Sequence, residues 1–162
     1  RNMYFIPEKR FYHTEIGHNF RMTNLQAAVG VAQMARLDEF VERKRLMAAL
    51  YNELLLDLPI QLPVEKKWAK NIYWMYSIVL NNEVSLNTRQ CMQKLLEKGI
   101  QTRPFFIGMH EQPIFYDRGL FNNETFPICK RISRQGFYLP SGQAITDQQI
   151  SFVAQELCAI LS

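Results

Sequence analysis

GHNFRMTNLQAA, residues 17–28, joins a polar loop directly to the start of a helix. Thr23 is followed three residues later by Gln26, which is the spacing of a capping box, in which each side chain accepts a hydrogen bond from the other residue's backbone N–H. Asn19 and Arg21 stand just before this helix start, where amide and guanidinium donors favour an anion such as phosphate. The sequence therefore predicts an anion-binding loop ahead of a well-defined helix.

The composition is typical of an ordinary folded protein. Of the 162 residues, 48% are apolar and 21% are charged, and the formal net charge is +4. Because the Lys and Arg residues are scattered rather than striped, we predict no nucleic-acid partner. No apolar run approaches the ~20 residues that cross a bilayer, and no signal peptide is recognisable, so we predict no membrane partner and a cytoplasmic location.

The residues that most often bind metals or form disulfides show no supporting pattern. The three cysteines are Cys91, Cys129 and Cys158. They are widely spaced, and each falls within a predicted helix, which favours reduced thiols over a disulfide or a zinc site. The three histidines also lack a partner at the i+4 spacing of a helical metal site. We therefore predict no metal site.

Beyond residue 22 the sequence predicts one very long helical region followed by a small α/β layer. Residues 23–57 contain no Pro and one Gly, with apolar residues at helical intervals, which predicts one long helix or two nearly collinear ones. Pro59 and Pro63 end this region. The later pattern predicts strands over 73–80, 100–106 and 137–139, and helices over 86–96, 127–136 and 146–161. Because the connections are too short for a doubly wound domain, we expect an α+β layer with a mostly antiparallel sheet covered by helices.

Two glycines are expected to end helices. Gly99 stands where a left-handed C-terminal cap would fall, and Gly136 follows a short helix that begins at Pro127, the usual arrangement of proline and glycine at the two ends.

Several stretches of the chain together resemble the C-terminal part of an enzyme family. They are YH at 12–13, GHNFRMTNLQAA at 17–28, LD at 37–38, GI at 99–100, TRPFF at 102–106 and YLPSG at 138–142. In this order they are similar to the DegT/DnrJ/EryC1/StrS sugar aminotransferases. Within that family, TRPFF followed by His110 most resembles the perosamine synthetases. One departure from the family pattern is Gly108, at a position where relatives often carry proline.

The resemblance implies the type I aminotransferase fold and a division of the chain into three regions. Residues 1–22 would be a loop that faces the cofactor from the large-domain side, residues 23–57 an inter-domain helix, and residues 58–162 the C-terminal small domain. It also implies pyridoxal phosphate as cofactor and transfer of an amino group, usually from glutamate, to a nucleotide-linked 4-keto-6-deoxysugar. The family's enzymes are homodimers with shared active sites.

The same resemblance implies that the chain is a fragment without the Schiff-base lysine, which in the family lies upstream of residues 17–28. We therefore assign no catalytic residue, give that role to neither Lys9 nor Asp38, and expect the chain alone to be inactive. Asn19 and Arg21 are the expected cofactor-binding residues, with Asn19 reaching the cofactor phosphate of the other subunit. The expected substrate-binding residues are His13, Arg103, Phe105, Phe106 and His110.

Each assignment has a structural alternative. Asn19 could adopt a left-handed turn conformation, and His13 could brace its own loop. Arg103 could pair with an acidic residue at the sheet edge, and one of Phe105 and Phe106 could belong to the core. For the chain as a whole, the alternative is a non-catalytic interaction or ligand-binding module.

Overall fold

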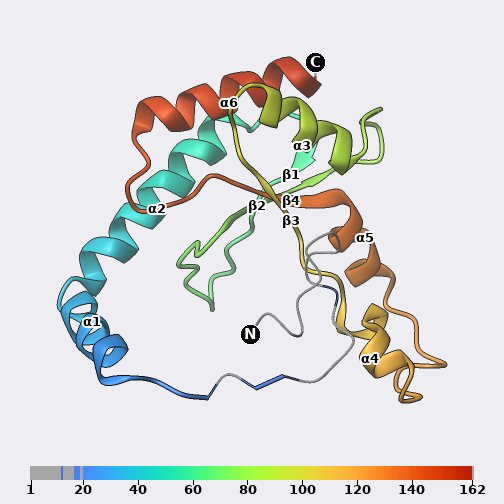
Figure 1. Cartoon of the computed structure of the whole chain (residues 1–162). Helices are drawn as coiled ribbons and strands as arrows, with labels where there is room; N and C mark the ends of the chain where they lie inside the picture. The colour runs from blue at the N-terminus through green and yellow to red at the C-terminus, as the bar shows by residue number, and fades with distance from the viewer. Residues whose placement is uncertain (1–11, 13–16, 19, 162) are drawn as a thin grey trace.

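A four-stranded antiparallel sheet lies at the centre of the structure, with the strands in the order β1-β2-β4-β3 (Figure 1). The strands are β1 Ile60–Gln61, β2 Tyr76–Leu80, β3 Arg103–Pro104 and β4 Gly136–Leu139. The computed structural model describes residues 12, 17–18 and 20–161, and the statements below concern those residues. The mostly antiparallel sheet expected from the sequence is confirmed.

The pairing of β2 with β4 divides the sheet into two faces. Tyr76 lies opposite Leu139, and Ile78 lies opposite Phe137. Because side chains alternate along a strand, these residues share one face, and all four are buried. The intervening residues, such as Ser77, lie on the other face.

Helices cover both faces of the sheet. On the face of Tyr76 lie α2 Leu37–Leu54, α3 Thr88–Glu97 and α6 Asp147–Leu161, and α2 and α6 pack side by side (Figure 1). The other face carries α5 Pro127–Gln135, which packs against β2 and β4. The most completely buried side chains of the core are Met47, Tyr51, Leu55, Tyr76, Ile78, Cys91, Leu95, Phe137, Ile150 and Leu157. The helical spacing predicted for 86–96 and 146–161 thus corresponds to helices that bury one face.

The long helical region consists of two helices rather than one. The first is α1 Asn24–Met34, and a turn at residues 35–36 separates it from α2. Arg36 leaves helical geometry, with φ −115° and ψ 15°. The alternative of two helices over 23–57 is therefore confirmed, but Figure 1 shows that α1 points away from the axis of α2, so the expectation that they are nearly collinear is wrong. No Gly or Pro marks the break; it falls where packing on the core begins, since α2 has buried residues and α1 has none.

The predicted helix caps are confirmed. Thr23 and Gln26 form the expected capping box at the start of α1. Thr146 and Gln149 form the same pair of hydrogen bonds at the start of α6. Gly99 has φ +77°, the left-handed conformation expected after α3.

The short helix with Pro127 at its start and Gly136 at its end is confirmed, whereas the strand over 100–106 differs from its prediction. Gly136 is the C-cap of α5, with φ −99°, and it also opens β4. A Cβ on this residue would lie 2.5 Å from the ring of Phe105, so glycine is required by close packing. The expected strand over 100–106 is reduced to Arg103–Pro104, because only these two residues pair with β4.

Three short elements were not predicted. They are β1, the 3-10 turn Met109–Glu111 and α4 Pro113–Tyr116.

The strand predicted over 73–80 begins only at Tyr76. Tyr73 has a positive φ of 48°, which is not an extended conformation, so it cannot belong to the strand.

Candidate functional site

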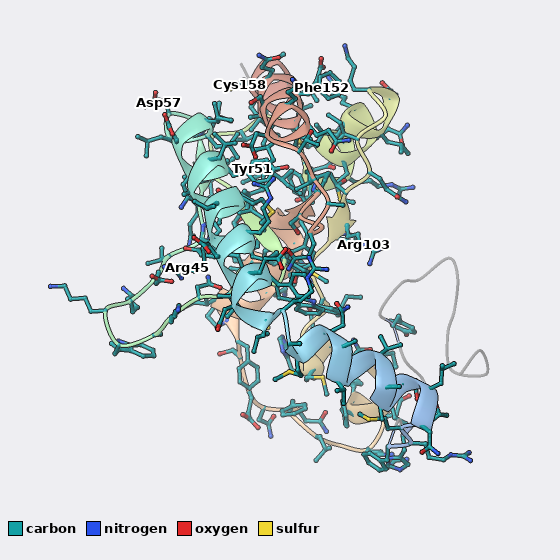
Figure 2. All side chains as sticks on the ribbon, turned by 90° about the vertical axis from the view of Figure 1, so that its left-hand side faces the viewer. Arg45, Tyr51, Asp57, Arg103, Phe152 and Cys158 are labelled. Carbon is teal, nitrogen blue, oxygen red and sulfur yellow. The ribbon has the colours of Figure 1, made fainter. Side chains whose placement is uncertain are left out.

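Three of the expected substrate-binding residues meet at the edge of the sheet. The register of β3 on β4 pairs Arg103 with Tyr138. The ring of Phe105 stacks on Tyr138 at 4.6 Å and 25°, and the ring of Phe106 meets Tyr138 edge-on at 6.2 Å. Figure 2 shows Arg103 at the outer edge of the molecule, on the side away from α2. We call Arg103, Phe105, Phe106 and Tyr138 the aromatic edge.

The side chains of the aromatic edge are more exposed than core side chains, as expected for a binding surface. Phe106 is 45% exposed and Arg103 is exposed, whereas Phe105 and Tyr138 are half-buried. Two stacked rings beside an unburied guanidinium offer both an apolar face and a bidentate donor. Partial burial raises the pKa of the Tyr138 hydroxyl, so this group stays a neutral donor. Arg103 forms no ion pair within the described part of the chain, contrary to its structural alternative.

His110 lies next along the chain, in the 3-10 turn, and is braced by packing. Its ring centroid is 4.7 Å from that of Phe126. Gly108 is buried beneath it: a Cβ there would come within 2.6 Å of His110 Cε1 and 2.8 Å of Cys129 Sγ. Because Gly108 has no side chain, the imidazole of His110 can pack directly against this loop.

We call the loop before α1 the entry loop, and its described residues, 17–18 and 20–22, are exposed. Arg21 is exposed, and no described carboxylate pairs with it. The helix α1 that follows it packs extensively against no other described helix or strand, and Figure 1 shows α1 and α4 on opposite sides of the chain. The other two predicted residues of this region, His13 and Asn19, lie outside the described residues.

A clamp of three residues, which sequence reasoning missed, closes the loop before β2. Arg45 of α2 donates to the Glu65 carboxylate at 2.6 Å and to the backbone oxygen of Asn71 at 2.7 Å. The N–H of Asn71 donates to the same carboxylate at 2.7 Å. The Arg45 guanidinium and this N–H lower the pKa of Glu65 to about 2. Figure 2 shows Arg45 on α2 beside this loop. No local pattern joins residues 45, 65 and 71, so only the fold reveals the clamp.

Lys44 is the one buried lysine in the described part of the chain, and it has a structural role. Its Nζ donates to the backbone oxygen of Trp74 at 3.0 Å and to that of Ser141. Burial lowers its pKa. An amine already bonded to two carbonyls joins α2 to the segments that flank β2 and β4, and it is not free to attack a ligand.

The three cysteines lie on α3, α5 and α6, each within a predicted helix, and Cys91 is the one of the three that is buried. Burial raises the pKa of Cys91 to about 11, so its thiol is neutral and unreactive.

Across the described ranges no group of three or more His, Cys, Asp or Glu residues is placed to hold a metal ion. Within the same residues, no helix combines the length and apolarity of a membrane span.

Comparison with known proteins matches most of the chain to one family. The family model of the DegT/DnrJ/EryC1/StrS aminotransferase family matches residues 4–158. A GDP-perosamine synthase of Vibrio cholerae is 34% identical over 158 residues, which are 98% of this chain and 41% of that protein. A putative pyridoxal phosphate-dependent aminotransferase, EpsN of Bacillus subtilis, is 33% identical over 154 residues, 93% of this chain and 39% of the relative.

Solved structures agree with this assignment. The crystal structure of DesI in the presence of its TDP-sugar product matches with a TM-score of 0.74 and 28% identity, over 86% of this chain and 36% of DesI. The chain thus spans about two fifths of the length of the curated relatives it matches. Its helices and antiparallel sheet form part of an aminotransferase fold.

Proposed function

Because the chain belongs to the DegT/DnrJ/EryC1/StrS aminotransferase family, we propose that it is the C-terminal part of a sugar aminotransferase. The cofactor of this family is pyridoxal phosphate. The proposed reaction transfers an amino group from glutamate to a nucleotide-linked 4-keto-6-deoxysugar in the cytoplasm. The match to a GDP-perosamine synthase over 98% of the chain is the observation that carries this proposal.

The entry loop fits the phosphate end of this cofactor. Arg21 is exposed and unpaired by any described carboxylate, and it immediately precedes the capped first turn of α1. A guanidinium beside a helix N-terminus is a favourable environment for a phosphate. We propose that Arg21 and Asn19 hold the cofactor phosphate, with Asn19 acting across the interface of a homodimer.

The aromatic edge fits the nucleotide sugar. Its stacked rings can lie against a planar base or the apolar face of a sugar, and Arg103 can donate two parallel hydrogen bonds to a diphosphate. His110, held by Phe126 and the loop at Gly108, follows this surface four residues later along the chain, and we propose that it contacts the same substrate. We propose that His13 joins the same substrate site.

The reactive amine of the proposed enzyme is not Lys44, which is held by two backbone carbonyls. When bound, the cofactor supplies an electron-accepting ring that stabilises negative charge on the carbon bearing the amino group. This chain would contribute binding and orientation, while the lysine would come from the part of the relatives that the chain does not span.

The test is a binding and activity assay on the full-length protein. We expect an absorbance band near the visible edge that borohydride reduction abolishes, and amino transfer from glutamate to a 4-keto-6-deoxysugar nucleotide. Arg21→Gln is expected to weaken cofactor binding about tenfold, the usual scale for a charge-assisted hydrogen bond. Arg118→Gln, at another exposed arginine, is the matched control.

Two results would reject the proposal. A full-length protein that binds no pyridoxal phosphate would favour the non-catalytic module. Cofactor binding without amino transfer to any 4-keto sugar nucleotide would retain the family's cofactor and reject the proposed substrate class.

A further inference from the structure

His110, which we assign to the substrate site, lies against the first turn of α5. Its ring centroid is 4.7 Å from that of Phe126, the N-cap residue of α5, and the two ring planes are inclined by 41°. Neither ring nitrogen of His110 forms a hydrogen bond with another residue in the described part of the chain. Packing therefore sets the orientation of this imidazole.

Cys129, three residues after Phe126, shares the space beside Gly108 with the same imidazole. A Cβ on Gly108 would lie 2.6 Å from Cε1 and 2.8 Å from Nδ1 of His110, and 2.8 Å from the Sγ of Cys129. The thiol and the ring thus lie on the same side of Gly108. Because residues three apart share a helix face, Phe126 and Cys129 approach this loop from one side of α5.

These contacts distinguish the two ring nitrogens of His110. Nδ1 and Cε1 are the ring atoms closest to Gly108, so Nε2 is the nitrogen farther from it. The side chain is half-buried, so part of the ring is accessible. Nε2 can donate or accept a hydrogen bond, depending on the tautomer. It is therefore the nitrogen that the packing leaves for a ligand.

The 3-10 turn that carries His110 is also held at the other end of α5. Glu111, the next residue, accepts a hydrogen bond at 2.9 Å from the guanidinium of Arg134, in the last turn of α5. The ring of Phe105 packs against Gly136, which ends the same helix. One helix thus contacts two of the residues assigned to the substrate, or their immediate neighbours, along its whole length.

We propose that Phe126 and Cys129 are positioning residues that hold the imidazole of His110 so that Nε2 contacts the sugar nucleotide. The inference rests on the proposed function, because it takes this nucleotide as the ligand of His110. The thiol fills space into which the ring would otherwise move, and the Phe126 ring limits rotation of the imidazole plane. A hydrogen bond to the substrate depends on this orientation, since hydrogen bonds weaken steeply when misaligned.

The first test measures steady-state kinetics of the full-length holoenzyme with glutamate and a GDP-linked 4-keto-6-deoxyhexose. Cys129→Ala is expected to lower kcat/KM for the sugar nucleotide about tenfold, the scale of one lost hydrogen bond, and to leave kcat/KM for glutamate unchanged. Phe126→Leu is expected to act in the same direction. Cys129→Ser keeps an atom in the place of Sγ and is expected to retain the wild-type values.

The matched control is Ile128→Ala, in the same turn of α5. Ile128 is 70% exposed, so its truncation is expected to change neither kcat/KM. An equal loss for both substrates in Cys129→Ala would indicate a general structural role and would overturn the proposal. Wild-type kinetics in both Cys129→Ala and Phe126→Leu would overturn it as well.

A second measurement needs no turnover. Histidine labelled with 15N gives separate Nδ1 and Nε2 resonances, and His110→Gln identifies those of His110. In the ligand-free protein, Cys129→Ala is expected to shift these resonances, whereas Ile128→Ala leaves them in place. Adding the sugar nucleotide without glutamate is expected to shift Nε2 more than Nδ1. A larger shift at Nδ1 would contradict the proposed orientation.

The positioning role and the proposed function fail separately. A full-length protein that does not bind the sugar nucleotide would reject the proposed substrate class, while its ligand-free spectra would still show whether Cys129 sets the orientation of the imidazole. If Cys129→Ala leaves those spectra unchanged, the positioning role is rejected, whichever substrate the protein uses.

Discussion

The buried amine of Lys44, on α2, donates hydrogen bonds to the segment before β2 and to the segment after β4. Replacing it with Met removes both hydrogen bonds of its Nζ and leaves the backbone oxygens of Trp74 and Ser141 without their donor. We expect Lys44→Met to lower the free energy of unfolding by about 1–3 kcal/mol, the cost of leaving buried acceptors unpaired. Urea denaturation measures this, with Lys67→Met, at an exposed lysine, as the control. Equal stability of the two variants would refute the structural role of Lys44.

Glu65 makes the clamp on the loop before β2 sensitive to acid. Its pKa is about 2 in the folded protein, below the ordinary value of 4.5. The unfolded chain therefore binds more protons between these values, so the contribution of Glu65 to stability is present above about 4.5 and is lost as pH falls through about 2. We expect the stability of the wild type to fall more steeply over this window than that of Glu65→Gln. Denaturant unfolding at a series of pH values measures both slopes, and parallel slopes would contradict the prediction.

At the scale of single residues, the sequence predicted the groups at the aromatic edge but not their arrangement. TRPFF and His110 were identified by resemblance, whereas Tyr138 joins them only through the register of β3 on β4. The bracing of His110 by Phe126 and Gly108 likewise depends on how α5 approaches the loop. Contacts between distant segments leave no local pattern, so sequence periodicity does not reveal them.

At the scale of elements, replacing glycine with alanine is expected to change stability in opposite directions at Gly136 and at Gly30. A Cβ on Gly136 would lie 2.5 Å from the Phe105 ring and 2.6 Å from the Ile132 backbone oxygen, whereas nothing lies within 4 Å of a Cβ on Gly30. We expect Gly136→Ala to destabilise the fold by about 1–3 kcal/mol through overpacking.

Gly30→Ala is expected to stabilise α1 by up to about 1 kcal/mol, because glycine is a poor helix former. Chemical denaturation of both variants, alongside the wild type, gives the two changes. If Gly136→Ala is neutral, the β4 segment must be able to move away from Phe105, and the proposed packing role is wrong.

The sequence predicted the ends of helices correctly where the capping residues themselves form the end of the helix. The boxes at Thr23 and Thr146 and the left-handed Gly99 lie where the sequence indicated. The position of the break at Arg36 and the change of direction there were not predicted, because helical propensity continues across it and only docking against the core distinguishes α2 from α1. The length of β3 was overestimated for a similar reason, since pairing with β4 extends over only two residues.

At the scale of the whole molecule, α1 presents an uncovered apolar surface. Leu25 is 77% exposed and Val29, one turn later on the same side of the helix, is 56% exposed, while Val31, 74% exposed, lies on the opposite side. Apolar side chains exposed on several sides of a helix mark a contact with another part of an assembly. The proposed homodimer would cover it, together with the part of the relatives that this chain does not span.

We expect Val29→Lys to weaken dimerisation of the full-length protein while leaving its far-UV circular dichroism unchanged. Val64→Lys, at a similarly exposed valine in the loop before β2, is the matched control. Size-exclusion chromatography with light scattering measures the oligomeric state. Dimers of equal stability in both variants would show that α1 lies outside the interface.

Because the turn at residues 35–36 joins α1 to α2, a small rotation at this turn moves the far end of α1 by a larger distance. Its 11 residues extend about 16 Å from the junction, so a tilt of about ten degrees there displaces the far end by about 3 Å. Arg36 holds the junction through surface contacts alone, a carboxylate at 2.6 Å and the Phe40 ring at 4.8 Å. Small rotations at Arg36 would thus be magnified at the loop that we propose binds the cofactor phosphate, while the sheet and its helices stay still.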